Sequence, residues 1–292
     1  MSLITIKNEK LRMCVDTQGA QMMSIQTADD CEYLWQGDSA YWADRSPVLF
    51  PFIGRLTNNR CKVGGVTYPM GIHGFAAGSV FTCTEQQTDQ VTLTLTANGE
   101  TMCQYPFDFV FSVTYALEEN RIAVVYKVEN NSDSTMPFAI GGHPGFNVPL
   151  EDGVCFADYY LEFSDACLPD RVSFSPAVYL QGADKVYPLR EDRIIDLTHE
   201  LFDDDAIILK NMSREVTLRS RKSCRAVKVS YPDMPYVGFW HWPKTDAPYV
   251  CIEPWSSLPS RQNVVEELTC KSDMLQLPAG QVYENSWIIT LY

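Results

Sequence analysis

The chain contains 292 residues, and its 37 Asp and Glu against 23 Lys and Arg give a formal net charge of −14. An acidic chain lacks the basic surface that nucleic-acid binders and polybasic membrane-surface proteins need, so we expect neither nucleic acid nor a membrane among its partners. The hydrophobic fraction of 46% is typical of a globular protein. We expect a single domain over residues 1–292, since this length suffices for one large core.

Apolar and polar residues alternate with a period of two along much of the sequence. In chain order, the clearest alternating stretches are residues 92–97, 107–115, 121–130, 215–220, 226–231 and 236–242. Such alternation, rich in Val, Ile, Thr and aromatic residues, is typical of antiparallel strands with one buried face. Helical spacing is confined to 197–202 and 263–269, and nothing suggests alternating strands and helices. We therefore predict an all-β fold, a large antiparallel β-sandwich with very few short helices.

The ten cysteines are scattered along the chain and include no C-x-x-C pair. Many lie in apolar, strand-like runs, which indicates buried, reduced thiols rather than disulfides or a zinc ribbon. No segment reaches the roughly 18 apolar residues of a membrane span. The first residues also lack the apolar core of a signal peptide, so we expect a cytoplasmic protein.

The first candidate site residue is Arg55, at the end of the apolar segment SPVLFPFIGRL. A guanidinium presents a fixed fork of donors that suits vicinal hydroxyls, carboxylates or phosphates. The alternative is a structural ion pair, with Glu253 as one candidate partner. Both interpretations stay open, because an arginine can position a base and also contact a ligand.

Two histidines lie in similar segments that contain glycines and an aromatic residue. His73 is in GIHGFA, and His143 is in GGHPGFN, where Pro144 favours an extended backbone before it. Glycine permits unusual backbone angles and lets a ligand approach closely. Each segment alone is compatible with a structured turn, but two such segments in one chain favour a shared site.

An acidic run, Asp203 to Asp205, and several aromatic residues are further candidates. Most charge runs lie on solvated surfaces, but Asp205 directly precedes an apolar stretch and is the residue that we select to point into a pocket. Trp240 and Phe75 are candidates to bind a sugar, since aromatic rings pack well against its C–H face. Of the remaining histidines, we expect His199 on the surface and His241 in a structural role.

Glu253 ends the apolar stretch APYVCIE, directly before a Pro-Trp bend. Burial at the end of a strand would raise its pKa towards the range of a general base that works at neutral pH. The alternative is again a structural ion pair with an arginine.

Other kinds of chemistry have weaker support in the sequence. No H-x-H or H-x-E-x-H spacing indicates a metal site, and a three-histidine site would use nearly all of the four histidines. The sequence also contains no G-x-S-x-G, Walker A or G-x-G-x-x-G motif. Loop histidines, a strand-end glutamate, an arginine and aromatic residues indicate acid/base chemistry on a neutral polyol, without a metal.

At these residues the sequence resembles the aldose 1-epimerase (galactose mutarotase) family, and within it the LacX-like branch. The resemblance rests on SPVLFPFIGRL, GIHGFA, GGHPGFN, FDDDAIIL and CIEPW, in this order, and on the C-terminal LPAGQVYENSWIITLY. It implies the family's very large twisted β-sandwich and a carbohydrate isomerase that acts on a small sugar such as galactose. It implies no cofactor, and it leaves a monomer or a homodimer open.

The resemblance also implies a role for each matching residue. Glu253 corresponds to the general base that takes the proton of the anomeric hydroxyl, and His143 to the general acid that protonates the ring oxygen. His73, Arg55 and Asp205 correspond to positions that hold the substrate. The ring would open, rotate about the C1–C2 bond and close as the opposite anomer.

Two other functions are compatible with the sequence. A hexose 6-phosphate 1-epimerase would need two or three cations at one end of the pocket, and Arg45, Arg55, Arg60 and Lys62 are the candidates. Related sequences often carry an arginine after HGFA, where this chain has HGFAAG, and this difference favours a free sugar. A non-catalytic sugar-binding protein is the third possibility, but binding alone does not need a matched acid and base.

Overall fold

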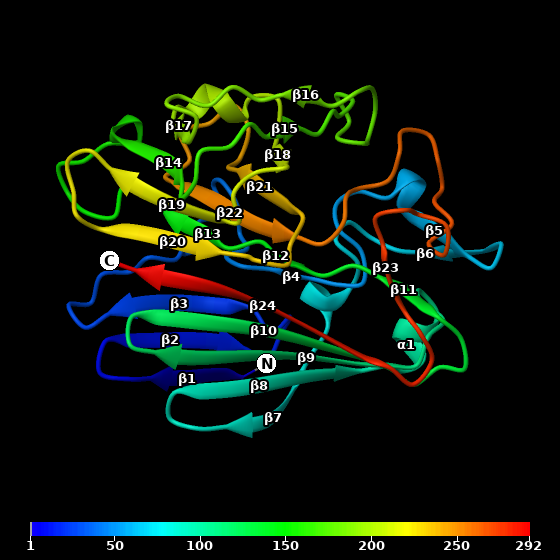
Figure 1. Cartoon of the computed structure of the whole chain (residues 1–292). Coiled ribbons are helices and arrows are strands. Elements are labelled where there is room, and N and C mark those ends of the chain that lie inside the picture. The colour runs from blue at the N-terminus through cyan, green and yellow to red at the C-terminus, as the bar shows by residue number, and fades with distance from the viewer. Residues whose placement is uncertain (1) are drawn as a thin grey trace.

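The computed structural model describes residues 2–292, and strands make up most of its regular structure (Figure 1). The only α-helix in this range is α1 (Gly99–Met102). Four 3-10 helices complete the helical content: η1 (Thr57–Asn59), η2 (Ala76–Gly78), η3 (Phe156–Asp158) and η4 (His199–Phe202). The predicted all-β fold with very few short helices is confirmed.

The larger of the two main sheets has nine strands, all paired antiparallel. In spatial order they are β17 (Ile194–Asp196), β14 (Tyr159–Phe163), β19 (Glu215–Ser220), β20 (Ala226–Ser230), β24 (Val282–Leu291), β10 (Arg121–Asn130), β9 (Phe109–Glu118), β8 (Gln90–Thr96) and β7 (Thr82–Gln86). Strands β8, β9, β10, β19 and β20 correspond to predicted alternating stretches.

The second main sheet has eight strands, holds Glu253 and Trp240, and carries His143 between two of its strands. In spatial order they are β16 (Lys185–Val186), β15 (Asp170–Arg171), β18 (Ile207–Lys210), β21 (Tyr236–Trp240), β22 (Tyr249–Trp255), β12 (Gly141–Gly142) and β4 (Val48–Leu49), with β13 (Gly145–Asn147) also paired to β22. In Figure 1 this sheet lies above the strands β24, β10, β9, β8 and β7 of the first sheet.

Three small sheets complete the fold. They are β1 (Leu3–Lys7) with β2 (Leu11–Asp16) and β3 (Met22–Thr27), β5 (Arg60–Val63) with β6 (Val66–Pro69), and β11 (Met136–Phe138) with β23 (Leu275–Leu277). No helix within residues 2–292 is long and apolar enough to cross a membrane. All ten cysteines are free thiols.

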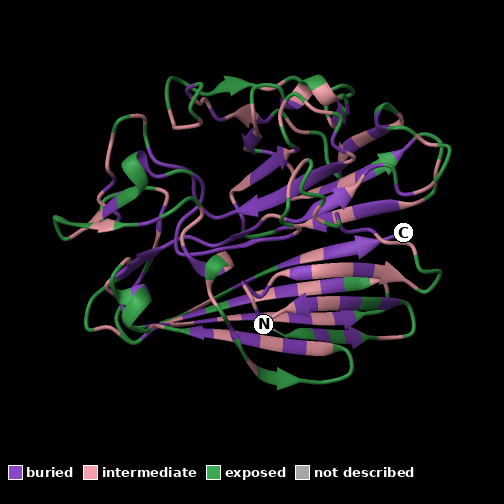
Figure 2. Cartoon of the chain, turned by 180° about the vertical axis from the view of Figure 1, so that it is seen from behind, coloured by how far each residue is buried: buried purple, intermediate pink, exposed green. Residues whose placement is uncertain are grey.

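The burial pattern explains why the sheets stack. Every second residue of β9 and β10 is buried, so each strand has one apolar face (Figure 2). β22 is buried along its whole length. One hydrophobic cluster joins both sheets, with Phe111 and Val124 from the first and Ile208, Val250 and Ile252 from the second. Because the core fills the space between the two sheets, we expect a functional site where the second sheet is open to solvent.

The helical spacing of 263–269 is not realised as a helix, and this prediction is wrong. Tertiary hydrogen bonds replace the helical ones: the Lys62 amide donates to the Glu266 carbonyl, and the Leu268 amide donates to the Lys62 carbonyl. Asn263 also has φ +62°, which a helix does not allow. The single turn expected at 197–202 is present as η4.

Candidate active site

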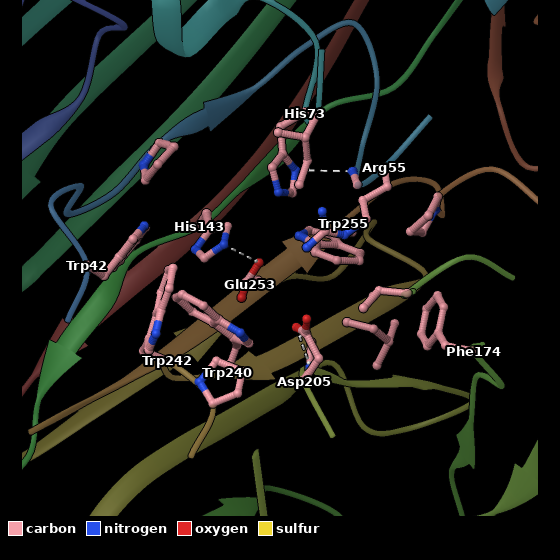
Figure 3. A pocket seen from close by; sticks show the side chains of 18 of the residues that line it. Trp42, Arg55, His73, His143, Phe174, Asp205, Trp240, Trp242, Glu253 and Trp255 are labelled. Atoms are coloured by element: carbon pink, nitrogen blue, oxygen red, sulfur yellow. Dashed lines mark hydrogen bonds and ion pairs between the residues drawn. The ribbon is translucent and has the colours of Figure 1, made fainter. Parts of the chain in front are cut away.

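The eight-stranded sheet brings His143 and Glu253 face to face. Pairing with β22 matches residues on both sides of His143: Gly141 lies opposite Trp255, and Gly145 lies opposite Cys251. His143 therefore lies opposite Glu253, with His143 Nε2 3.3 Å from Glu253 Oε2 (Figure 3). The structure thus brings together the predicted acid and the predicted base, and backbone pairing defines their separation.

Both members of this pair are withdrawn from water. The Glu253 side chain is 1% exposed and that of His143 is 12% exposed. Burial, and secondly the charge of Asp205, raise the pKa of Glu253 well above its usual range. Burial, and secondly His73, lower the pKa of His143 well below its usual range. Glu253 Oε2 and His143 Nδ1 are both buried and have no hydrogen-bond partner within residues 2–292.

His73 is held by the backbone of the segment that also carries Arg55. Its Nδ1 accepts a hydrogen bond from the Gly54 amide at 3.1 Å, and its own amide donates to the Gly54 carbonyl at 3.0 Å. Burial, and secondly the Arg55 charge, lower the pKa of His73 to about 4. The ring is therefore neutral near pH 7, and its proton is on Nε2 because Nδ1 is an acceptor. His73 presents a fixed hydrogen-bond donor.

A glycine makes the conformation of this loop possible. Gly74 has φ +76°, and a Cβ atom there would lie 2.3 Å from the Phe50 carbonyl oxygen. Only glycine fits this close approach. The turn at Gly74 places the His73 side chain on the cavity wall and directs the Phe75 side chain away from it. Phe75 enters the core, where its ring stacks on Phe109 and packs edge-on against Phe50. It does not line the cavity, so the prediction that Phe75 contacts a sugar is wrong.

His143 and Glu253 line a cavity of about 500 Å³. Tryptophan rings form much of its wall: Trp42, Trp240, Trp242 and Trp255. The Trp42 ring centroid is 4.9 Å from that of His143, and the Trp240 ring packs edge-on against His143 at 5.5 Å. Such a wall combines apolar faces with a few polar groups, which is typical of small-molecule sites.

The charged groups of the cavity are mainly acidic. Among the described residues that line it, Arg55 is the one cation, beside three carboxylates, Asp44, Asp205 and Glu253. Arg55 is exposed and forms no ion pair with Glu253, which lies against His143 instead. Asp205, half-buried two residues before β18 begins, lies on the wall, as Figure 3 shows. Of its neighbours, Asp203 and Asp204 are exposed and do not line this cavity.

Sequence reasoning did not single out several residues of the wall. Trp42, Asp44 and Trp242 belong to irregular segments, and Phe174 and Val178 to a short hairpin. The interval 36–46 carries neither alternation nor a motif, and its only signal is the clustering of aromatic and acidic residues. Their placement depends on contacts between segments that are distant in the sequence.

The same region contains a set of groups with metal-binding atoms. Among residues 2–292, ligand atoms of His143, Cys251 and Glu253 lie within 4.8 Å of one another. Burial raises the pKa of the Cys251 thiol well above its ordinary value, whereas zinc binds the thiolate. Cys251 also does not line the cavity. The arrangement therefore suits proton transfer better than metal binding.

The other two histidines form a separate pair behind the tip of β21. His241 is buried, its Nδ1 lies 2.8 Å from the Trp242 carbonyl oxygen, and its Nε2 lies 3.2 Å from His199 Nδ1. Nδ1 of His241 must donate to the carbonyl, so its Nε2 accepts from His199. His199 also stacks on Phe156. The prediction placed His199 on the surface, but the side chain is half-buried.

We expect this pair to make stability depend on pH. Burial lowers the pKa of His241 to about 4, whereas an unfolded histidine has a pKa of about 6.5. The unfolded chain therefore binds the proton first, and stability is lost as the pH falls from about 6.5 to 4, by up to about 3 kcal/mol. Urea unfolding at pH 7 and pH 4.5 measures this loss, which His241→Gln should reduce. An equal loss in both proteins would contradict the prediction.

Comparison with known proteins agrees with this geometry. A sequence model of the aldose 1-epimerase family matches residues 2–268. The chromosomal LacX protein of Lactococcus lactis subsp. lactis is 36% identical over 290 residues, which cover 95% of this chain and 96% of that protein.

Solved structures also match essentially the whole chain, and two of them show the agreement. One is a galactose mutarotase related enzyme from Lactobacillus acidophilus, 34% identical, covering 100% of this chain and 97% of that one with a TM-score of 0.95. The other is a galactose mutarotase-like protein from Lactobacillus casei, 32% identical, with full coverage of both chains and a TM-score of 0.95. The family model, the full-length relative and the shared fold all agree. The chain therefore belongs to the aldose 1-epimerase family of carbohydrate isomerases.

Proposed function

We propose that the protein interconverts the α and β anomers of a free aldohexose, with Glu253 as general base and His143 as general acid. The observation that carries this proposal is the 3.3 Å approach of His143 Nε2 to Glu253 Oε2 on the wall of a sugar-sized cavity. Non-catalytic binding would not need two titratable groups held so close in a buried position.

The two pKa shifts are those of a pair that shares one proton, and the proposed roles place that proton on His143 when the sugar binds. A raised pKa makes the Glu253 carboxylate a stronger proton acceptor, and a lowered pKa makes the protonated His143 a stronger donor. Glu253 takes the proton of the anomeric hydroxyl while the bond between C1 and the ring oxygen breaks, and His143 protonates that oxygen. The open aldehyde rotates about C1–C2, and the reverse proton transfers close the ring on the other face.

Other residues of the wall are suited to hold the sugar. Nε2–H of His73 and the guanidinium of Arg55 offer donors to hydroxyl or ring oxygens, and the carboxylate of Asp205 accepts from hydroxyls. Trp240 offers an apolar edge or face to the C–H groups of the ring. The proposed acid and base therefore act on a substrate whose orientation the wall defines.

The cavity favours a neutral sugar over a hexose 6-phosphate. Bidentate or clustered cations usually hold a phosphate, but Arg55 is the one cation among the described residues of this wall, beside three carboxylates. Arg45 donates to the Met23 carbonyl and to Gln36 Oε1, away from the cavity. Arg60 and Lys62 belong to β5 and do not line it.

Mutarotation assays of freshly dissolved sugars test the proposal. We expect the protein to accelerate anomer exchange of α-glucose or α-galactose, measured by polarimetry or by NMR of the anomeric protons. We expect kcat/KM for glucose 6-phosphate to be lower by at least tenfold, because the wall carries an excess of negative charge. Exchange of the 6-phosphate alone would contradict the proposed substrate and favour the phosphorylated alternative.

A further inference from the structure

One side chain of the catalytic cavity wall, that of Trp255, is not used by the proposed reaction. Trp255 lies two residues after Glu253 in β22, so both side chains point to the same side of the strand. The Trp255 ring lines the cavity and is 4% exposed. Figure 3 shows this ring beside Glu253, on the side that faces away from His143. The Glu253 carboxyl group therefore lies between an imidazole and an indole.

Polar atoms of Trp255 and Glu253 lack partners of their own. Trp255 Nε1 and Glu253 Oε2 are both buried, and neither has a hydrogen-bond partner within residues 2–292. Buried groups without a partner are costly and rare in folded proteins. Burial and then Asp205 raise the pKa of Glu253, whereas the nearby N–H of Trp255 lowers it. A buried donor and a buried acceptor therefore lie side by side without an aligned hydrogen bond between them.

Contacts on two sides fix the position of the indole. Gly141 of β12 lies opposite Trp255, and a Cβ atom at Gly141 would lie 3.0 Å from Trp255 Cδ1. The His73 ring packs edge-on against the indole, with 6.2 Å between the ring centroids. Because Cδ1 is bonded to Nε1, these contacts also fix the direction of the N–H bond. The strand that leads to His143 thus holds a donor next to Glu253.

The titratable and charged side chains near Glu253 are His143, Asp205, Cys251, Tyr249, His73 and Arg55. Asp205 disfavours a charge on Glu253. Burial raises the pKa values of the Cys251 thiol and the Tyr249 hydroxyl, so both stay protonated. A positive charge in contact with the carboxylate arises only when His143 holds a proton. An indole N–H does not titrate, so Trp255 offers a donor at every pH.

We propose that Trp255 is a positioning residue, which donates its indole N–H to the ionised Glu253 and so holds the shared proton of the pair on His143. The pair has one proton for two sites, Glu253 Oε2 and His143 Nε2, which are 3.3 Å apart. The proposed reaction starts with this proton on His143, because the carboxylate must accept the anomeric proton. A hydrogen bond to the charged carboxylate favours that form. This inference rests on the proposed mutarotase function and deepens it.

The variant Trp255→Phe tests this inference, because it keeps an aromatic ring and removes the N–H. We expect kcat/KM for anomer exchange at pH 7 to fall about tenfold, which corresponds to about one pKa unit and to one hydrogen bond to a charged group. The pH profile of kcat/KM gives the two pKa values of the pair, and their sum should rise by about one unit. The form without protons always contains the ionised carboxylate and the form with two never does, so this rise does not depend on where a single proton lies.

Trp242→Phe is the matched control for the kinetic test. Trp242 also lines the cavity, but its side chain is 45% exposed and its ring packs against Trp240. This variant removes an indole N–H from the same wall without changing the donor beside Glu253. It should keep the native sum of the two pKa values, whatever its effect on KM.

A measurement on the native protein needs neither a substrate nor a change at Trp255. With tryptophan isotopically labelled at the indole nitrogen, the N–H proton signal of Trp255, assigned from through-bond spectra, should move downfield as Glu253 ionises. In Glu253→Gln this movement should be absent. Trp287 provides an internal control, because its Nε1 is also buried without a partner within residues 2–292 but it does not line the cavity. The Trp287 signal should not follow the pair.

Each contrary outcome has a distinct meaning. A native sum of pKa values in Trp255→Phe, or a Trp255 signal that does not titrate, would overturn the role of Trp255 and leave the mutarotase function intact. A lower rate with unchanged pKa values would also overturn it, because the ring would then serve only to pack against the sugar. If the native protein accelerates no sugar, the proposed function is contradicted, and the Trp255 signal still decides whether the indole binds the carboxylate.

Discussion

Replacement of Glu253 by Gln is expected to lower kcat/KM for anomer exchange by about 10²–10⁴-fold. The amide has nearly the same shape as the carboxyl group, so packing against Gly238 on the neighbouring strand is preserved. It cannot, however, accept the proton of the anomeric hydroxyl. Burial raises the pKa of Glu253 and so favours its neutral form. A neutral amide in its place therefore leaves no buried charge without a partner, and we expect the fold to survive. NMR of the anomeric protons measures the rate, and thermal unfolding measures the stability.

Glu266 provides a matched control for this variant. It is also 1% exposed, but it accepts hydrogen bonds from the backbone amide and the guanidinium of Arg261. Glu266→Gln should therefore lower the temperature of unfolding and leave kcat/KM close to the native value, because Glu266 does not line the catalytic cavity. A native rate in Glu253→Gln would exclude Glu253 as the base.

Replacement of His143 by Asn is expected to give a loss of similar size, about 10²–10⁴-fold, because the ring oxygen loses its proton donor. Asn can still form hydrogen bonds but does not titrate near neutral pH. The double variant with Glu253→Gln should be little slower than either single variant, since residues that act as a unit are not additive. Losses that multiply would indicate that the two residues act independently.

His199 is the matched control for the histidine variant. It is a half-buried histidine outside the cavity, so His199→Asn should leave kcat/KM for glucose unchanged. The pH profile gives a second readout, because a pair with a lowered histidine pKa and a raised carboxyl pKa holds a single proton over a broad interval. Native activity should be level through neutral pH, and this plateau should be lost in His143→Asn. A native rate in that variant would exclude His143 as the acid.

The strands could be predicted because each half-buried strand carries its own signal. In β9 and β10 the alternation of residues in the sequence matches the alternation of buried and exposed positions. The segment 263–269 shows the limit of such signals. Its helical spacing loses to hydrogen bonds with Lys62, which lies about two hundred residues earlier in the sequence, and local propensity cannot reveal such a partner.

The site could be predicted only where glycine, proline and motif residues mark it. His73, His143 and Glu253 lie in such segments, and the structure places all three on one cavity. Phe75, adjacent to one of these motifs, faces the core because a single turn at Gly74 redirects the chain. Asp44 lies on the wall through contacts that no local pattern encodes.

The two halves of this site are built from different kinds of structure. Paired backbone of β12, β13 and β22 holds His143 opposite Glu253, whereas the hairpin around Val178 and the loop residues Trp242 and Pro243 form another part of the cavity wall. Loop substitutions are tolerated far more readily than changes in a buried strand. Under the proposed function, substitutions in the hairpin and the loop would change which sugar the cavity accepts, while the pair held by the strands would keep the same reaction.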